Sequence, residues 1–237
     1  MKSVLKKFFQ NLPLLSFLLL IAPAQAENQD QTNSIKSESA VLITPTLAGR
    51  VPVKSWKTMR DERIVKQDKD YSCGAASLAT LLNEQYNQKV TEEEILKAMN
   101  KEDDRASFED MANIMPQFGF KAQGFAASWE QLTQLHIPVL VYTKNRKEDH
   151  FSVLRGIDDN TVWLADPSLG NRTFSREQFL SMWETRDDDM ENAHLRGKFL
   201  AILPAQPDIQ ASDDFFTKTP RRQTIPAIGQ LSIRPKP

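Results

Sequence analysis

Residues 73–83 are the segment that most restricts the folds open to this chain. A helix over these residues would be small or apolar on nearly every side, because its side chains include Ala75, Ala76, Leu78, Ala79, Leu81 and Leu82. Such a helix has no polar face to present to water, so it belongs at the buried centre of a domain. Ser72 precedes it and can cap its first turn. The sequence therefore predicts a fold built around a buried helix that begins at Cys73.

Further helices precede a run of strands in the rest of the predicted domain. Patterns typical of helix starts stand at Thr91, Ser107, Ser128 and Ser175. Pro116 is expected to end the second of these helices. Apolar or alternating stretches predict strands over residues 118–125, 138–143, 150–157, 161–165 and 198–203. This order indicates the α+β class, with N-terminal helices packed on an antiparallel sheet.

The first 26 residues have the pattern of a secretory signal peptide. A start with three lysines precedes an apolar run over residues 12–22, and Ala24-Gln25-Ala26 supplies a small-residue cleavage site. A retained membrane anchor is the alternative, but the apolar run is short for a bilayer span. We therefore expect cleavage after Ala26, no stable membrane span in the mature protein, and a periplasmic or secreted location.

Residues 61–205 are the part that we expect to pack as one domain. The polar and proline-containing stretch 27–60 predicts a linker. Residues 206–237 contain several prolines and little periodicity, which predicts a disordered or loosely docked tail. A partner-binding segment is the alternative for this tail, because the pair Phe215-Phe216 adds apolar content.

The charge balance gives no sign of a nucleic-acid partner. The predicted signal peptide holds three of the 30 basic residues and none of the 31 acidic residues, so the mature chain would carry four more acidic than basic residues. A protein that binds nucleic acid usually presents an excess of basic side chains. We therefore expect no nucleic-acid partner.

Cys73 is the only cysteine of the chain, although exported proteins usually use cysteines in pairs. A single cysteine is either an inert core thiol or a reactive one. Its place at the start of a helix favours reactivity, since unpaired backbone N–H groups there stabilise a thiolate. The count excludes cysteine-based zinc sites, and His136, His150 and His194 show no close metal-ligand spacing. We expect no metal and no organic cofactor.

A thiolate nucleophile needs a histidine base and a group that orients the histidine. His150 is the best placed of the three, because it opens a strand directly after a charged loop. His136 follows a helix, and His194 lies in an acidic stretch. The alternative for each histidine is a solvated side chain without a catalytic role.

A hairpin places Asp166 beside His150. If a three-residue loop joins the two strands, Ile157 pairs with Thr161 and Asp166 falls opposite Ser152. His150 then points to the same face of the sheet and is a diagonal neighbour of Asp166. A register shifted by one residue would place Asp166 on the other face. The alternative for Asp166 is a structural turn, since Asp-Pro often begins one.

Three segments together resemble a known family. These are residues 67–76 (QDKDYSCGAA), 150–154 (HFSVL) and 163–168 (WLADPS). The order Gln, Cys-Gly, His, Asp-Pro is similar to that of the bacteriocin-processing peptidases, family thirty-nine of the cysteine peptidases, which cleave after double-glycine leaders. Gln67 lies six residues before Cys73, where its amide can donate a hydrogen bond to an oxyanion.

The resemblance covers residues 62–204 and implies a papain-like fold. It also implies that Cys73 is the nucleophile, His150 its base, Asp166 the group that orients His150, and Gln67 an oxyanion donor. Many members of the family are domains of ABC exporters, whereas this chain looks like the stand-alone exported members that accompany secretion systems, including those of functional amyloid. Ser72 stands where the leader-cutting members usually carry Asp, so double-glycine cleavage is not implied.

We therefore predict an exported cysteine peptidase that hydrolyses a protein or peptide substrate through a thioester. A secretion-system component is a further partner that the resemblance implies. Two alternatives remain at this point. One is an acyl transferase in which an amine intercepts the same thioester, and the other is a non-catalytic binding or chaperone module with the peptidase fold.

Overall fold

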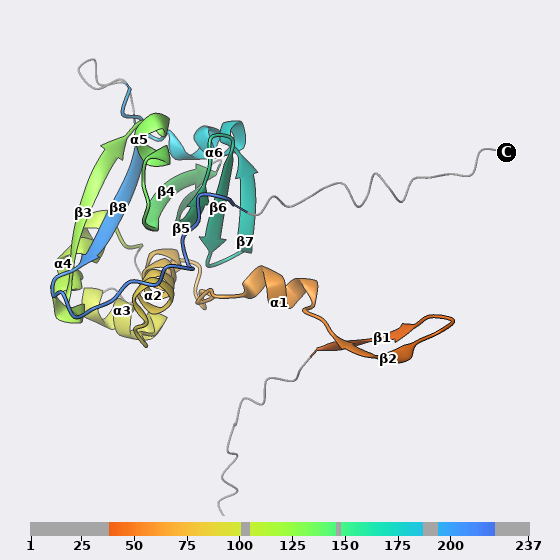
Figure 1. Ribbon diagram of the computed structural model, residues 1–237. Coiled ribbons are helices and arrows are strands. Elements are labelled where there is room, and N and C mark those ends of the chain that lie inside the picture. The colour runs from red at the N-terminus through yellow and green to blue at the C-terminus, as the bar shows by residue number, and fades with distance from the viewer. Residues whose placement is uncertain (1–37, 101–104, 146–147, 187–193, 221–237) are drawn as a thin grey trace, which may run out of the picture. The chain divides into compact units, whose positions relative to one another are not determined.

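The computed structural model describes residues 38–100, 105–145, 148–186 and 194–220 (Figure 1). The predicted signal peptide and the end of the predicted tail lie outside these residues. The helices are α1 Trp56–Asp61, α2 Cys73–Tyr86, α3 Glu92–Met99, α4 Phe108–Ile114, the 3-10 helix η1 Met115–Phe118, α5 Trp129–Thr133 and α6 Arg176–Trp183. The strands are β1 Ser39–Ile43, β2 Ala48–Pro52, β3 Phe120–Ala127, β4 Val139–Asn145, β5 Glu148–Ile157, β6 Thr161–Asp166, β7 Gly170–Ser175 and β8 Gly197–Pro204. Within the described ranges, no helix has the length and apolar character needed to cross a membrane.

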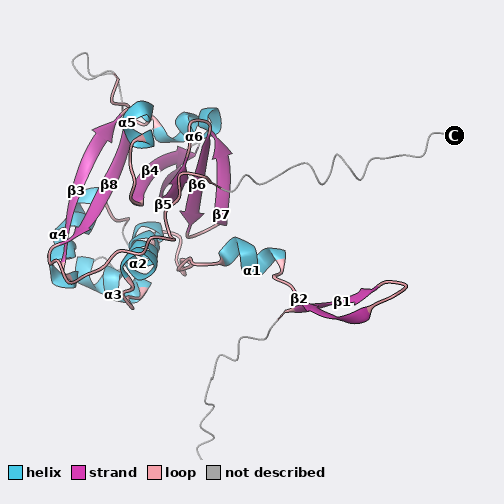
Figure 2. Ribbon diagram, in the orientation of Figure 1, coloured by secondary structure: helices cyan, strands magenta, loops and turns pink. Residues whose placement is uncertain are grey.

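Six strands form one antiparallel sheet in the order β3-β8-β4-β5-β6-β7. Helices α2, α3 and α4 lie on one side of it, and α5 and α6 lie toward its other side (Figure 2). Each side has its own buried apolar cluster. The first includes Leu78, Leu81, Phe120 and Val153. The second includes Leu132, Val141, Phe179 and Trp183.

The buried helix predicted from residues 73–83 is α2. Twelve of its fourteen residues are buried, and it ends at Asn87, whose left-handed backbone donates an N–H to the carbonyl of Leu82. The other predicted helix starts are confirmed as capping boxes at Thr91, Ser107, Ser128 and Ser175. Local side-chain chemistry therefore decides where these helices begin.

Pro116 stands directly after the end of α4, as predicted, because the α-helix ends at Ile114 and Met115 is its C-cap. The sequence did not predict the 3-10 helix η1 that follows, which has this proline in its first turn, where no N–H is needed. The strand β7 was not predicted either. Its sequence, GNRTFS, lacks apolar alternation, and its pairing with β6 holds it in the sheet.

The hairpin between β5 and β6 has a different register at its turn from the one predicted. Ile157 pairs with Val162 and not with Thr161, and the pairing then shifts between Leu154 and Gly156. The prediction was wrong at the turn because a β-bulge, which adds one residue to one strand, is not visible in an alternating pattern.

The extra residue of the bulge is Arg155. On the side of the bulge away from the turn, the two strands pair in the predicted register. Val153 pairs with Ala165, so the next residues along, Ser152 and Asp166, come together. The hydroxyl of Ser152 donates a hydrogen bond to Asp166 at 3.0 Å. The predicted face of Asp166 is therefore correct, although it depends on an irregularity that the prediction did not include.

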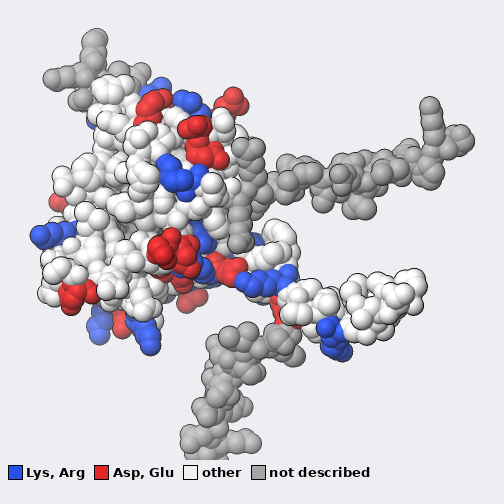
Figure 3. Space-filling model, in the orientation of Figure 1, with Lys and Arg blue, Asp and Glu red and all other residues white. Residues whose placement is uncertain are grey.

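The predicted linker and tail are both structured in part. Residues 39–52 form the hairpin of β1 and β2, and its side chains are exposed, with Ile43 at 76 %. Figure 3 shows this hairpin almost free of charged side chains, whereas basic and acidic side chains are interspersed on the visible face of the domain. Helix α1 contacts β7, where the Asn171 amide donates to the carbonyl oxygen of Glu62 at 2.8 Å.

The structure differs from the predicted disordered or loosely docked tail over residues 206–220. Phe215 is fully buried in the first apolar cluster. The backbone of Ser212 donates to Gln85, and that of Thr217 both donates to Arg155 and accepts from Ile157. One aromatic side chain and these few backbone bonds dock the segment, and a sequence pattern without periodicity does not reveal such contacts.

Candidate active site

Cys73 is the first residue of α2, and it is buried. Ser72 holds the N-cap position, but its side chain does not cap the helix as predicted and donates instead to the carbonyl of Lys69 at 2.7 Å. Burial by itself raises the pKa of the Cys73 thiol. The hydrogen bond and charge of His150, with backbone hydrogen bonds at Phe151 and Gly74, outweigh burial and lower that pKa below its usual value. The site therefore favours a thiolate.

His150 lies on β5, between Cys73 and Asp166. Its Nε2 atom donates to Oδ2 of Asp166 at 2.9 Å, and the ring also hydrogen-bonds Cys73. Burial acts to lower the pKa of His150, but the hydrogen bonds and charges of Asp166 and Cys73 raise this pKa to about 10. The ring is therefore an imidazolium at neutral pH, beside a thiol whose pKa is lowered.

Asp166 ends β6 and is held by hydrogen bonds on both carboxylate oxygens. Oδ2 accepts from His150 and from the Ser152 hydroxyl, and Oδ1 accepts from the backbone N–H groups of Ser168 (2.9 Å) and Leu169 (2.8 Å). Burial acts to raise the pKa of Asp166, but these donors and the charge of His150 lower it. Asp166 therefore stays ionised and fixes the direction of the imidazole ring.

Gln67 is tied to the loop that follows Asp166. Its backbone N–H donates to the carbonyl of Pro167 (3.2 Å), and its Oε1 accepts from the Ser168 hydroxyl (2.6 Å). Its Nε2 donates one hydrogen to the carbonyl of Lys69 at 2.9 Å. Because an amide nitrogen carries two hydrogens, one remains to donate. Gln67 lines the same hollow as His150 and Asp166.

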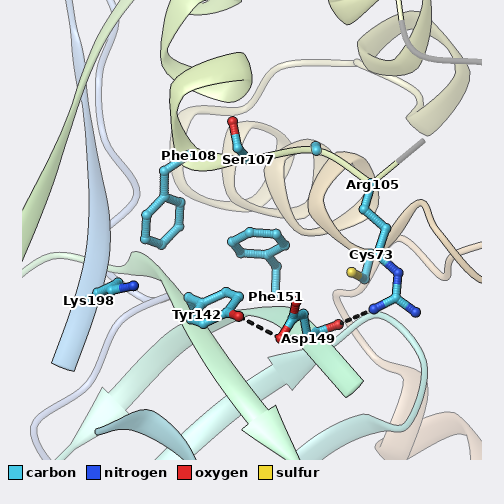
Figure 4. A pocket seen from close by; sticks show the side chains of 9 residues that line it. Cys73, Arg105, Ser107, Phe108, Tyr142, Asp149, Phe151 and Lys198 are labelled. Atoms are coloured by element: carbon cyan, nitrogen blue, oxygen red, sulfur yellow. Dashed lines mark hydrogen bonds between the residues drawn. The ribbon is translucent and has the colours of Figure 1, made fainter. Parts of the chain in front are cut away.

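Two hollows lie next to these residues. One, of about 500 Å³, is lined by Gln67, His150 and Asp166 among others. The other, of about 350 Å³, contacts Cys73 and is walled by aromatic rings from β4, β5 and α4 (Figure 4). A peptide bond at Cys73 would therefore have room for substrate residues in the hollow beside the thiol and in the one beside His150.

The structure brings together the sequence-predicted residues Cys73, His150 and Asp166, with Gln67 beside them. It does not bring in His136 or His194, which are exposed. Sequence reasoning missed the positioning hydroxyls of Ser152 and Ser168. Ser152 could have been found, because a residue two positions from His150 in a strand shares its face. Ser168 carried no such signal, because it lies in a loop.

The described residues contain no group of three His, Cys, Asp or Glu side chains that could hold a metal ion. A thiolate beside an imidazolium, with amide donors at hand, can attack a carbonyl carbon and stabilise the oxyanion that forms.

Comparison with known proteins finds a family and individual relatives that this chain resembles. The family model described as "Peptidase C39 family" matches residues 61–186. The chain is 35 % identical over 151 residues to "Probable functional amyloid protease FapD" of Pseudomonas fluorescens, which covers 60 % of this chain and 67 % of that protein. It is 30 % identical over 181 residues to the protein of the same description from Pseudomonas aeruginosa, which covers 72 % and 75 %.

Among solved structures, the fold is similar to that of the peptidase domain of Streptococcus ComA, described as a bifunctional ABC transporter of a quorum-sensing pathway. The TM-score is 0.50 at 19 % identity, and the match covers 60 % of this chain and 97 % of that domain. This likeness confirms the predicted α+β, papain-like fold.

Proposed function

Because this chain belongs to the peptidase C39 family and is a cysteine-type peptidase, we propose that it cleaves peptide bonds with Cys73 as nucleophile, His150 as acid and base, and Asp166 as the residue that orients His150. One observation carries this proposal. The imidazole of His150 hydrogen-bonds both Cys73 and Asp166, the latter through Nε2. A histidine without a catalytic role would not need to bond both a thiol and a carboxylate, and an inert core thiol would not need a histidine partner.

The reaction follows from these contacts. The thiolate of Cys73 attacks the carbonyl carbon of the scissile bond, and the oxygen of that carbonyl becomes an oxyanion. The free amide hydrogen of Gln67 and the backbone N–H of Cys73 donate to that oxyanion. The imidazolium of His150 gives its proton to the leaving amine, which leaves a thioester on Cys73.

Water completes the cycle. His150, now neutral, takes a proton from water as the hydroxide attacks the thioester carbon. The carboxylic acid departs, and Cys73 returns as a thiolate beside an imidazolium. Asp166 keeps its charge throughout and holds the ring in the orientation that both proton transfers need.

The proposal extends to the place of action. The signal-peptide pattern of residues 1–26 supports export to the periplasm or beyond. The relatives named as probable functional amyloid proteases support a protein or peptide substrate. With the signal-peptide pattern, we infer that this substrate is exported and that the chain acts beside a secretion system.

Cys73→Ala tests the proposal. In cells that express either form, the N-termini of exported proteins are compared by mass spectrometry, and the purified proteins are treated with a thiol-directed probe. We expect Cys73→Ala to abolish both cleavage and labelling with an unchanged melting temperature, because the small side chain fits the buried position. Full cleavage by Cys73→Ala would overturn the mechanism. To separate hydrolysis from acyl transfer, an amine is added to the reaction and the product masses are measured. Hydrolysis gives a free carboxylic acid, and acyl transfer gives the amide of the added amine.

A further inference from the structure

The hollow beside Cys73 is an aromatic cavity with a lysine across it from the thiol (Figure 4). The rings of Phe108 and Tyr142 pack against that of Phe151, with centres 5.2 and 5.5 Å apart. Lys198 lies on β8, and its ammonium stands 5.5 Å from the centre of the Tyr142 ring. These rings offer apolar surface to a substrate side chain, and Lys198 adds a positive charge.

One cation of this cavity, Lys198, has no carboxylate partner among the described residues. The one carboxylate of the cavity, Asp149, accepts a hydrogen bond from the Tyr142 hydroxyl at 2.6 Å, and the backbone carbonyl of Asp149 accepts from Arg105 at 3.2 Å. Burial and Asp149 raise the pKa of Tyr142 to about 12, so Tyr142 remains the donor. Over the part of the chain that the structure describes, no carboxylate forms an ion pair with Lys198. The ammonium of Lys198 therefore has hydrogen-bond donors left for an anionic group that enters the cavity.

We propose that Lys198 is a specificity residue that binds an acidic side chain of the substrate peptide in the cavity beside Cys73. The methylene groups of a glutamate or aspartate would pack against the aromatic walls, and its carboxylate would reach the ammonium of Lys198. A lysine or arginine of the substrate would meet the ammonium of Lys198 and be repelled. The inference rests on the proposed peptidase function and adds the substrate class.

Lys198 also lies beyond the part of the chain that matches the family. That match ends at residue 186, whereas β8 begins at Gly197 and joins the sheet between β3 and β4.

The test uses the full mature protein and a mixture of synthetic peptides of varied sequence, with cleavage sites read by mass spectrometry. For wild type we expect enrichment of Glu or Asp at one position near the cleaved bond. In the best substrate, replacing that acid by its amide should lower kcat/KM about tenfold, as expected for a lost hydrogen bond between charged groups.

Three variants complete the test. Lys198→Met should remove the preference for the acid over its amide, and Lys198→Glu should reverse it toward Lys and Arg. Lys121→Glu is the matched control, because Lys121 is exposed on β3 and does not line the cavity. It should keep the wild-type preference.

The outcomes separate the two proposals. Cleavage without an acidic preference, or an unchanged preference in Lys198→Glu, overturns the inference and leaves the peptidase function standing. Absence of any Cys73-dependent cleavage by wild type overturns the proposed function and this inference with it. Lys198→Glu could melt at a lower temperature than wild type. In that case the inference is decided by comparing how wild type and Lys198→Met cleave the acid substrate and its amide.

Discussion

The Nε2 atom of His150 lies 2.9 Å from Oδ2 of Asp166. This contact leaves Nδ1 as the ring nitrogen for the hydrogen bond to Cys73. The imidazolium therefore sits between two anions, a carboxylate and a thiolate, and its pKa rises because losing the proton would leave both anions unpaired. The consequences of this arrangement can be measured.

The first prediction concerns pH. The pKa of Cys73 is lowered by His150, and that of His150 is raised to about 10, so the ion pair is favoured below about pH 10 and persists to lower pH than the thiolate of an ordinary cysteine. The rate of Cys73 alkylation by iodoacetamide, measured across pH, should already be high at pH values below the range in which an ordinary thiol ionises, about 8.5. Cleavage should fall as pH rises through about 10, when His150 loses its proton. Alkylation of the urea-unfolded protein is the control, and identical profiles for the two states would contradict the prediction.

The second prediction concerns the carboxylate behind His150. Asp166→Asn removes a charge that favours the imidazolium, so the pKa of His150 should fall and that of Cys73 should rise. We expect kcat to drop by roughly 10²-fold or more, within the range typical of lost acid–base catalysis. The alkylation profile should shift to higher pH at the same time. Asp159→Asn, in the exposed turn after β5, is the control and should change neither quantity. Wild-type kcat in Asp166→Asn would show that Asp166 does not orient His150.

The third prediction concerns the loop after Asp166. The Ser168 hydroxyl donates to Oε1 of Gln67 and so fixes the orientation of the amide, with the nitrogen pointing away from Ser168. Ser168→Ala should lower kcat about three- to tenfold with little change in KM, the effect of one hydrogen bond. The alkylation profile of Cys73 should not move, because Gln67 acts on the oxyanion and not on the thiolate.

A double-mutant cycle supplies the control for this prediction. In a Gln67→Ala background the substitution Ser168→Ala should have almost no further effect, because the two residues act as one unit. An equal loss in both backgrounds would mean that Ser168 acts by another route, such as its backbone contact with Asp166.

The fourth prediction concerns the docked C-terminal segment. Phe215 is fully buried, so Phe215→Ala should lower the free energy of unfolding by ~3–5 kcal/mol, as for other buried aromatic residues. Phe125→Ala, at a position 42 % exposed, should cost much less. Urea denaturation measures both. Similar losses in the two variants would show that residues 206–220 do not pack as the structure describes.

Much of the fold could be read from local patterns. The capping boxes at Thr91, Ser107, Ser128 and Ser175 rest on side chains three residues apart, so the sequence alone contains the interaction. The same holds for α2, since a segment that is apolar on all sides has to be buried wherever it packs. Cys73 could be proposed as a nucleophile for a local reason as well. The residues that follow it specify a buried helix, and the first residue of a helix lies among unpaired backbone N–H groups.

The sequence by itself determined the four capping boxes and the central helix, because these depend on residues close together in the chain. The tertiary structure alone decided the bulge at Arg155 and with it the face of Asp166, the burial of Phe215, and the approach of Lys198 to the cavity beside Cys73. Arg155, Phe215 and Lys198 all contact segments far from them in sequence, as in the backbone hydrogen bond from Thr217 to Arg155. The free energy of these contacts comes from packing across the sheet, which no local pattern of side chains records.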